Sequence, residues 1–195
     1  MNLKVAGLAA LLAVSGCEFE VDPPAVGCGP SNCVGCCQEG VCVAGTAAAQ
    51  CGAAGATCSA CAGHQACLSQ ACGMDPNQVW LVTPSFAMVK DTNNGNGWDP
   101  DGSSPDPYVK LNGVKGPVAD NTVLAEWTQA YEVKASDLLA GTLTFQLFDE
   151  DTVSDDSISS AYALQVTEAD FAAGKKSYLP FDAVEQFEIK FQKKP

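Results

Sequence analysis

The cysteines are confined to one short stretch of the chain, and this constrains its fold more than any other feature. Of the 11 cysteines in 195 residues, Cys17 stands apart, and the other ten lie between Cys28 and Cys72. This stretch consists mainly of Cys, Ala, Gly, Ser and Gln, so it cannot build a hydrophobic core and must depend on cross-links. An even number of cysteines in an exported chain predicts up to five disulfides.

The first 16 residues are typical of a signal peptide. Lys4 precedes an apolar run that is too short to span a bilayer as a helix. Val14-Ser15-Gly16-Cys17 resembles the lipobox of bacterial lipoproteins, which implies cleavage before Cys17 and acyl chains such as palmitate on that residue. Glu18 then favours the outer membrane. An ordinary signal peptide that happens to end near a cysteine is the alternative.

The ten clustered cysteines form two similar units, which limits how they can pair. Each unit contains a C-x2-C step and ends with C-x4-C; the units are Cys28, Cys33, Cys36, Cys37 and Cys42, then Cys51, Cys58, Cys61, Cys67 and Cys72. Because each unit holds an odd number, at least one disulfide must join them. The full pairing cannot be deduced from sequence. A zinc ribbon built on Cys33, Cys36, Cys58 and Cys61 is the alternative, but an export signal favours disulfides.

The charge of the chain limits its partners and chemistry. There are 23 acidic residues against 10 basic ones, a net charge of −13, and none of the basic residues is arginine. Nucleic-acid binding is therefore not expected, because phosphate recognition depends on clustered Lys and Arg. His64 is the single histidine, and no free cysteine is expected. A conventional catalytic triad or a His-based catalytic zinc site is hard to assemble, so we expect no enzyme.

From residue 79 onward the pattern changes to that of a β-sandwich. Short runs rich in β-branched and aromatic residues are separated by Gly, Pro, Asn and Asp; they span residues 79–82, 108–111, 127–133, 143–148, 162–166 and 187–191. Such spacing predicts antiparallel strands. Residues 167–173 are the only helix-like stretch. We therefore expect a signal peptide (1–16), an acylated tether (17–27), a disulfide module (28–73) and a sandwich (74–195).

Two loops about forty residues apart carry clustered aspartates, each beside a strand-like run. Gathering carboxylates is costly unless a hard cation neutralises them, and Ca²⁺, which takes six to eight oxygen ligands, suits such a cluster. Two solvated acidic loops without an ion are the alternative. An EF-hand is excluded, because a loop that starts at Asp91 puts Asn96 where glycine is required and Gly102 where an acid is required.

Residues 79–191 resemble a C2 domain, an eight-stranded antiparallel β-sandwich. The resemblance rests on Asp106-Pro107-Tyr108-Val109-Lys110-Leu111, Asn121-Thr122 with Glu126-Trp127, residues 143–151, and Asp155-Asp156-Ser157-Ile158. It implies calcium ligands at Asp106, Asp149, Asp151 and Asp156, with one more in the first loop. The family usually has this ligand six residues before the position of Asp106, where this chain has Pro100. The flanking Asp99 or Asp101 is therefore the expected ligand, and Asp99 is preferred. Ser159 stands where the family has glycine.

Two apolar residues flank the predicted calcium cup. In membrane-docking C2 domains such tips enter lipid, so the resemblance implies that Trp98 and Val153 contact a membrane. Trp98 packed under its own loop is the alternative. Trp80 and Trp127 fall in strand-like runs and are expected in the core. Only Lys110 and Lys115 lie where phosphoinositide-binding members are lysine-rich, so that ligand is not expected.

Together these features predict a lipoprotein of the bacterial cell envelope. Its C2-like domain is expected to bind calcium and to attach to a phospholipid or protein surface in a calcium-dependent way. In one alternative, calcium only rigidifies the loops and the cysteine-rich module contacts an envelope partner. In another, the chain is a targeting module for a separate hydrolase.

Overall fold

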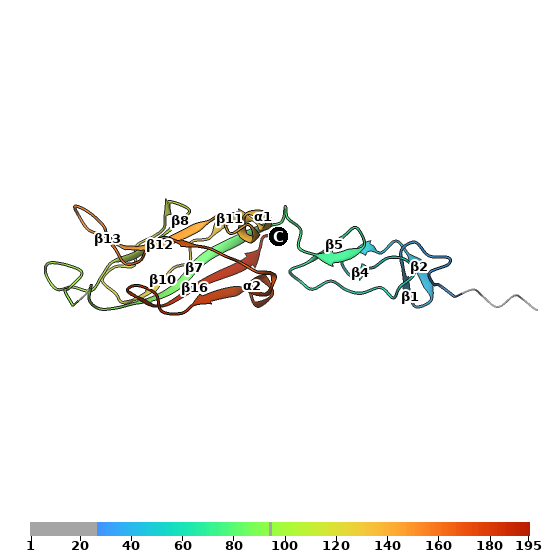
Figure 1. Cartoon of the computed structure of the whole chain (residues 1–195), viewed down its shortest axis with the longest axis horizontal. Helices are drawn as coiled ribbons and strands as arrows, with labels where there is room; N and C mark the ends of the chain where they lie inside the picture. Colours follow the sequence, from blue (N-terminus) through green and yellow to red (C-terminus); the bar gives the residue numbers. More distant parts are fainter. Residues whose placement is uncertain (1–26, 94) are drawn as a thin grey trace, which may run out of the picture.

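The computed structural model describes residues 27–93 and 95–195, which form a disulfide-linked module followed by a β-sandwich (Figure 1). The predicted signal peptide, Cys17 and all of the tether except Gly27 lie outside the described residues. The predicted cleavage and lipidation therefore stay predictions. In the part of the chain that the structure describes, no helix is long and apolar enough to cross a membrane.

The cysteine-rich module contains three small antiparallel hairpins and almost no apolar core. The hairpins pair β1 (Cys36–Gln38) with β2 (Val41–Val43), β3 (Thr46–Ala47) with β4 (Gln50–Cys51), and β5 (Ala66–Leu68) with β6 (Ala71–Gly73). The buried hydrophobic residues of this module are cysteines. Gly45, with φ at +71°, packs so closely that a Cβ would lie 1.9 Å from the carbonyl oxygen of Gly52. Cross-links thus replace a core, as the composition predicts.

All ten described cysteines are paired in disulfides. The bridges are Cys28–Cys37, Cys33–Cys42, Cys36–Cys58, Cys51–Cys67 and Cys61–Cys72. Two bridges lie within each five-cysteine unit and Cys36–Cys58 joins the units. This confirms the prediction that at least one disulfide joins two units with odd numbers of cysteines. The zinc-ribbon alternative is wrong, because each of its four cysteines is consumed by a disulfide and none keeps a free thiolate to bind metal.

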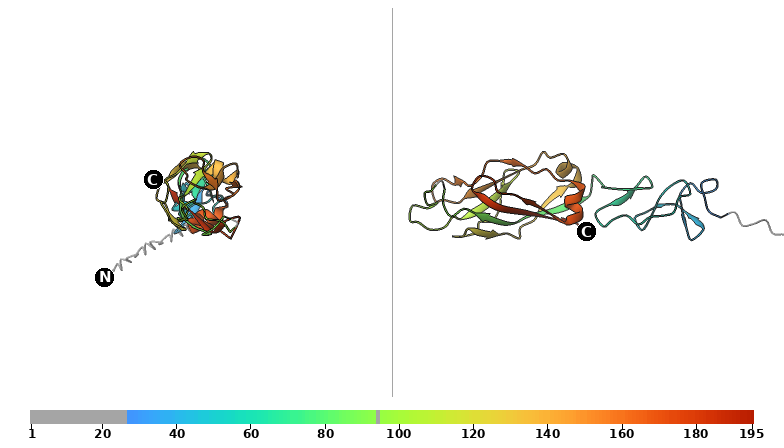
Figure 2. Two further views of the ribbon diagram at one scale, coloured as in Figure 1. Left: turned by 90° about the vertical axis from the view of Figure 1, so that its left-hand side faces the viewer. Right: turned by 60° about the horizontal axis from the view of Figure 1, so that its bottom comes forward.

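The sandwich consists of two antiparallel sheets. One sheet contains β7 (Val79–Val89), β10 (Leu124–Glu126), β11 (Tyr131–Lys134), β15 (Lys175–Tyr178) and β16 (Val184–Lys193). The other contains β8 (Pro107–Leu111), β9 (Val114–Lys115), β12 (Thr144–Asp149), β13 (Asp156–Ser157) and β14 (Tyr162–Ala163). Figure 2 shows the two layers packed face to face.

The ten strand segments fill eight strand positions. β16 pairs with β7 along its whole length, so β10 and β11, which also pair with β7, share its other edge. β8 likewise covers one edge of β12, so β13 and β14 share the other edge. The predicted all-β, eight-stranded antiparallel sandwich is therefore confirmed.

Residues that face inward from both sheets form one core. Alternate residues of β7 and β16 are buried, and Phe145 of β12 meets Phe187 of β16 with ring centroids 4.9 Å apart. Burying each such side chain contributes about 1.5–3 kcal/mol. Trp80 and Trp127 are both buried in this core, as predicted. Trp127 lies between β10 and β11, however, so the strand predicted over 127–133 begins only at Tyr131.

Two short helices cover the end of the sandwich nearest the disulfide module. α2 (Glu168–Ala173) begins with a capping box between Thr167 and Asp170 and ends at Gly174, so the predicted single turn is confirmed. α1 (Ala135–Leu139) was not expected, and the prediction of one helix-like stretch is wrong. Five residues are too few to show helical periodicity, and burial of Leu138 in the core holds this turn in place.

The two modules contact one another beside α2. Glu168 Oε1 accepts a hydrogen bond from Gln65 Nε2 at 2.6 Å, and His64 Nε2 lies 3.4 Å from the same oxygen. Met74, which follows the last hairpin, packs against the sandwich core. The joint between the modules is therefore built from side-chain contacts as well as from the chain itself.

Candidate metal centre

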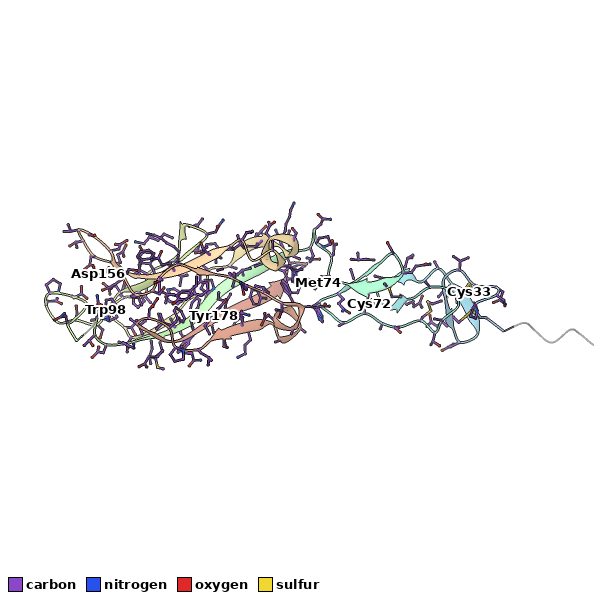
Figure 3. All side chains as sticks on the ribbon, viewed as in Figure 1. Cys33, Cys72, Met74, Trp98, Asp156 and Tyr178 are labelled. Atoms are coloured by element: carbon purple, nitrogen blue, oxygen red, sulfur yellow. A yellow bond between two sulfur atoms is a disulfide. The ribbon has the colours of Figure 1, made fainter. Side chains whose placement is uncertain are left out.

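Strand pairing brings two of the predicted ligands to the same side of the second sheet. Asp149 is the last residue of β12 and lies directly opposite Asp156 of β13. Directly opposed residues of neighbouring strands point to the same face, so their carboxylates are neighbours. Figure 3 places Asp156 and Trp98 at the end of the sandwich away from the cysteine-rich module.

The first loop supplies a third carboxylate beside Asp149. Pro107 of β8 is the partner of Asp149 across the sheet, so Asp106 lies next to it. The backbone N–H of Asp106 donates to Oδ1 of Asp149, with a distance of 2.5 Å between nitrogen and oxygen. Oδ1 of Asp106 in turn accepts from the backbone N–H of Asn121, a residue with φ at +48°. Sequence reasoning used Asn121 only as part of a motif and missed this supporting role.

These acids surround one cavity. One oxygen atom from each of Asp99, Asp149 and Asp151 lies within 4.8 Å of the others. A cavity of about 510 Å³ at the same place is lined by several acids: Asp99, Asp101, Asp106, Glu150, Asp151 and Asp156. The structure thus brings all five predicted ligand positions to one end of the sandwich.

Asp149 is the most unusual of these acids, because it is fully buried. Its Oδ2 atom has no hydrogen-bond partner among the described residues. Burial is the main cause that raises its pKa to about 6; the bond from the Asp106 N–H acts in the opposite direction, and the nearby charges of Asp99 and Asp151 add to the rise. A buried carboxylate oxygen without a partner is costly, and a cation in the cavity would supply that partner.

The structure distinguishes the two candidates in the first loop. Asp101 is exposed and closes its own turn, because its Oδ1 accepts from the hydroxyl of Ser103 at 2.6 Å and from the Ser103 N–H at 3.0 Å. These bonds lower the pKa of Asp101. Oδ2 of Asp99 lies 3.0 Å from the same hydroxyl oxygen, whose single proton serves the shorter bond to Asp101, and Asp99 is the one grouped with Asp149 and Asp151.

Trp98 is placed differently from the membrane-contact prediction. Its side chain is only 4% exposed, and its indole Nε1–H donates to the carbonyl oxygen of Lys90 at 2.8 Å. The membrane role predicted for Trp98 is therefore wrong, because the ring packs beneath its own loop, where the indole finds both a core and an acceptor. Both Trp98 and Val153 line the acidic cavity, but Val153 is 95% exposed in the third loop.

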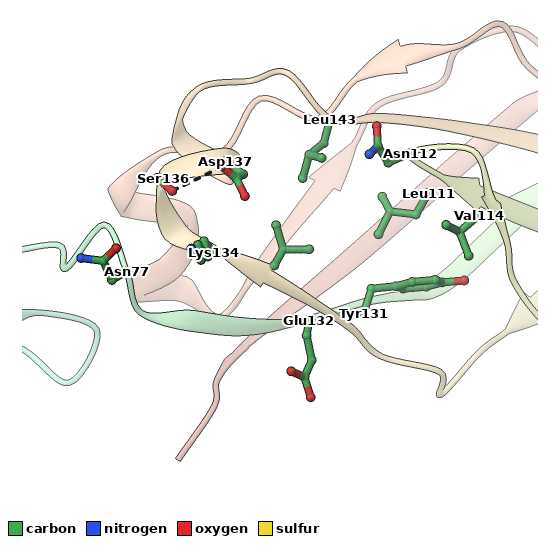
Figure 4. Close-up of a pocket in the computed structure, with 11 residues that line it drawn as sticks. Asn77, Leu111, Asn112, Val114, Tyr131, Glu132, Lys134, Ser136, Asp137 and Leu143 are labelled. Atoms are coloured by element: carbon green, nitrogen blue, oxygen red, sulfur yellow. Dashed lines mark hydrogen bonds between the residues drawn. The ribbon is translucent and has the colours of Figure 1, made fainter.

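A second cavity lies at the opposite end of the same strands (Figure 4). It measures about 560 Å³, and Leu111, Val133 and Leu143 line it together with polar residues. Its two acids are already engaged, since Glu132 forms an ion pair with Lys194 and Asp137 accepts a hydrogen bond from Ser136. Among the described residues, this cavity also has no counterpart to the three carboxylates of Asp99, Asp149 and Asp151 that converge at the first one.

The side chains around the acidic cavity would suit a hard divalent cation. Among the residues that the structure describes, the charged side chains lining it are all carboxylates, and neither histidine nor cysteine lines it. Ca²⁺ prefers six to eight oxygen ligands in flexible geometry, whereas Mg²⁺ takes one or two carboxylates and keeps its waters. Four or five carboxylates converging from two loops therefore fit calcium better than magnesium.

Comparison with known proteins gives matches at the level of structure. No protein family model matches the sequence, and no curated protein matches it. Among solved structures the chain is similar to a C2 domain (15% identity, covering 58% of this chain and 97% of that chain, TM-score 0.38). It is also similar to the first C2 domain of plant extended synaptotagmin 1, with 16% identity over 62% of this chain and 98% of that chain and a TM-score of 0.39. The calcium-bound pair of C2 domains of extended synaptotagmin 2 matches with 17% identity over 61% of this chain and 47% of that chain, at a TM-score of 0.40. These identities are low, so the ligand of the cavity has to be argued from the residues of this chain.

Proposed function

We propose that the acidic cavity binds Ca²⁺ and that the bound ion couples the sandwich to a lipid or protein surface. The proposal rests on Asp149: its buried Oδ2 has no hydrogen-bond partner in the described part of the chain, and oxygens of two further carboxylates lie within 4.8 Å of its carboxylate. A divalent cation removes both the repulsion and the missing contact. The motif resemblance to C2 domains supports the same conclusion.

The exposed Val153 supports attachment rather than simple ion storage. A valine that is 95% exposed beside a charged cavity places an apolar tip next to the cation. A lipid surface offers such a tip an apolar environment and offers the ion additional oxygen ligands. In this proposal a lipid on Cys17 holds the other end of the protein at the bacterial cell envelope, and the chain binds rather than catalyses.

A second function is favoured by the surface of the cysteine-rich module. Val34 and Val41 are 85% and 63% exposed although the module has few other apolar side chains. In this alternative, calcium only rigidifies the loops of the sandwich while the module contacts an envelope protein.

The test uses the full chain with Cys17→Ser, so that no lipid anchor contributes. Calorimetric titration with Ca²⁺ measures binding, and sedimentation with phosphatidylglycerol–phosphatidylethanolamine vesicles measures attachment. We expect the chain to bind calcium and to sediment with vesicles when calcium is present, and not to sediment with them in chelator. The double variant Asp149→Asn with Asp151→Asn should abolish calcium binding and sedimentation. Asp137→Asn, a loss of charge at the opposite end, is the control and should change neither.

The outcomes separate the two functions. Calcium binding that raises the melting temperature without vesicle sedimentation would support the structural alternative. An absence of calcium binding by the folded chain would exclude both.

A further inference from the structure

Asp155 lies in the third loop but faces away from the acidic cavity. Its neighbours Ser154 and Asp156 line the cavity, whereas Asp155 does not. Strand alternation explains this, because Asp156 faces the same side as Asp149 and the preceding residue faces the opposite side. Asp155 therefore reaches the outer face of the second sheet.

On that face Asp155 connects a strand with the loop. Its Oδ2 accepts a hydrogen bond from the hydroxyl of Tyr108 in β8. Its Oδ1 accepts from the backbone N–H of Asp151, at a long distance of 3.4 Å. Because the second bond is weak, the bond from Tyr108 contributes most of the attachment.

Tyr108 is a rigid anchor for this connection. It is fully buried, and its ring stacks on Phe148 with centroids 5.4 Å apart and planes inclined by 14°. The ammonium group of Lys115 lies 4.1 Å from its ring centroid. Burial, followed by the bond to Asp155, raises the pKa of the Tyr108 hydroxyl far above its ordinary value, so it keeps its proton and donates.

We propose that Asp155 is a positioning residue: by joining the Tyr108 hydroxyl to the backbone of Asp151, it holds the third loop so that Asp151 and Asp156 face the cation. This inference rests on the proposed calcium binding. The carboxylates of the loop repel one another, and a loop that is held in place beforehand binds the ion at a lower cost in conformational freedom. Asp155 itself contributes no ligand atom.

The principal test is Tyr108→Phe in the full chain, titrated with Ca²⁺ alone. This change removes one oxygen atom, leaves the stacked ring in place and keeps every carboxylate. The Kd for calcium should rise about ten- to a hundredfold, the worth of one hydrogen bond to a charged group, with an unchanged number of ions. Tyr162→Phe is the matched control, because it removes a hydroxyl that donates to Asp182, at 3.1 Å, away from the cavity. Its Kd should stay within about twofold of that of the unmodified chain.

Substitutions at Asp155 separate positioning from charge. Asp155→Ala removes both bonds, whereas Asp155→Asn keeps one acceptor oxygen for Tyr108 and should retain more affinity. Both variants remove the same charge, so the difference between their calcium Kd values isolates the hydrogen bond from Tyr108. Combining Tyr108→Phe with Asp155→Ala should weaken binding no further than Asp155→Ala alone, because both break one connection.

The results distinguish this inference from the proposed function. If the unmodified chain binds no calcium, the proposed function fails. If it binds calcium but Tyr108→Phe leaves its Kd unchanged, the positioning role is refuted and the function stands. A lower ion number in Asp155→Ala would also refute it, since Asp155 would then be a ligand. Melting curves in chelator identify any unfolded variant, and the comparison of Asp155→Ala with Asp155→Asn carries the test if Tyr108→Phe does not fold.

Discussion

In the absence of calcium, Asp149 should make the sandwich less stable at neutral pH than at mildly acidic pH. The folded protein holds the pKa of this carboxyl at about 6, against an ordinary value of 3.8. The folded state binds this proton more tightly than the unfolded state does, so protonation of Asp149 stabilises the fold. This contribution is complete below about pH 4 and is lost as the pH rises through 6. Ionised Asp149 thus opposes folding until a cation arrives.

The size of this effect follows from the pKa difference of about two, which is 6 minus 3.8. At about 1.4 kcal/mol for each pKa unit, the ceiling is about 3 kcal/mol. The cavity beside Asp149 opens to solvent, and screening reduces the expected loss to about 1–2 kcal/mol. Asp149→Asn removes the titrating group while keeping an acceptor for the N–H of Asp106.

Unfolding in urea with chelator and intact disulfides measures the effect. Trp80, Trp98 and Trp127 are all buried in the sandwich, so their fluorescence follows this module alone. At pH 8 the Asn variant should be about 1–2 kcal/mol more stable than the unmodified chain, and at pH 4 the two should agree. Other acids titrate in both proteins, so the difference isolates Asp149.

At pH 8, calcium should make the unmodified chain more stable than the Asp149→Asn variant. Calcium at about 100 times its Kd stabilises the unmodified chain by about 2.7 kcal/mol, whereas the variant gains little. A stability difference between the two proteins that stays constant from pH 4 to pH 8 would show that the buried carboxylate is not destabilising, and the reasoning would fail.

Three other measurements test separate parts of the structure. Calcium affinity should rise with pH through about 6 in calorimetric titrations, because Asp149 must lose its proton to bind the ion; equal affinity at pH 5 and pH 8 would contradict this. Val153→Ser should abolish vesicle sedimentation but leave the calcium Kd unchanged, since Val153 is an exposed tip without a ligand atom and the substitution adds no charge. Trp98→Ala should lower the unfolding free energy of the sandwich by about 3–5 kcal/mol in urea titrations, whereas a surface residue would cost less than about 1 kcal/mol.

The sequence predicts the main strands because they alternate strongly. Phe187–Phe191 and Leu143–Leu147 place one face in the core, and that pattern survives in β16 and β12. β15 was missed, because Lys175-Lys176-Ser177-Tyr178 is a polar edge strand that forms only by pairing with β16. Its stability comes from its neighbour and not from its own composition.

The carboxylates of the candidate site could also be predicted from the sequence, because regular strands position them. Asp149 and Asp156 are fixed by strand register, so their convergence follows from local spacing. The position of Trp98 depends on how a long, glycine-containing loop folds back to Lys90, which no periodicity encodes. The role of Asp155 likewise depends on Tyr108, 47 residues away.

The five disulfides have a consequence that follows from their overlap. Each closed loop overlaps the next one along the chain, from Cys28–Cys37 through Cys36–Cys58 to Cys61–Cys72. Every peptide bond between Cys28 and Cys72 is therefore spanned by at least one bridge. A single proteolytic nick anywhere in this segment would leave the sandwich covalently joined to the N-terminal part of the chain, and so would any two nicks, so release by cleavage within the segment would need at least three cuts or a reductant.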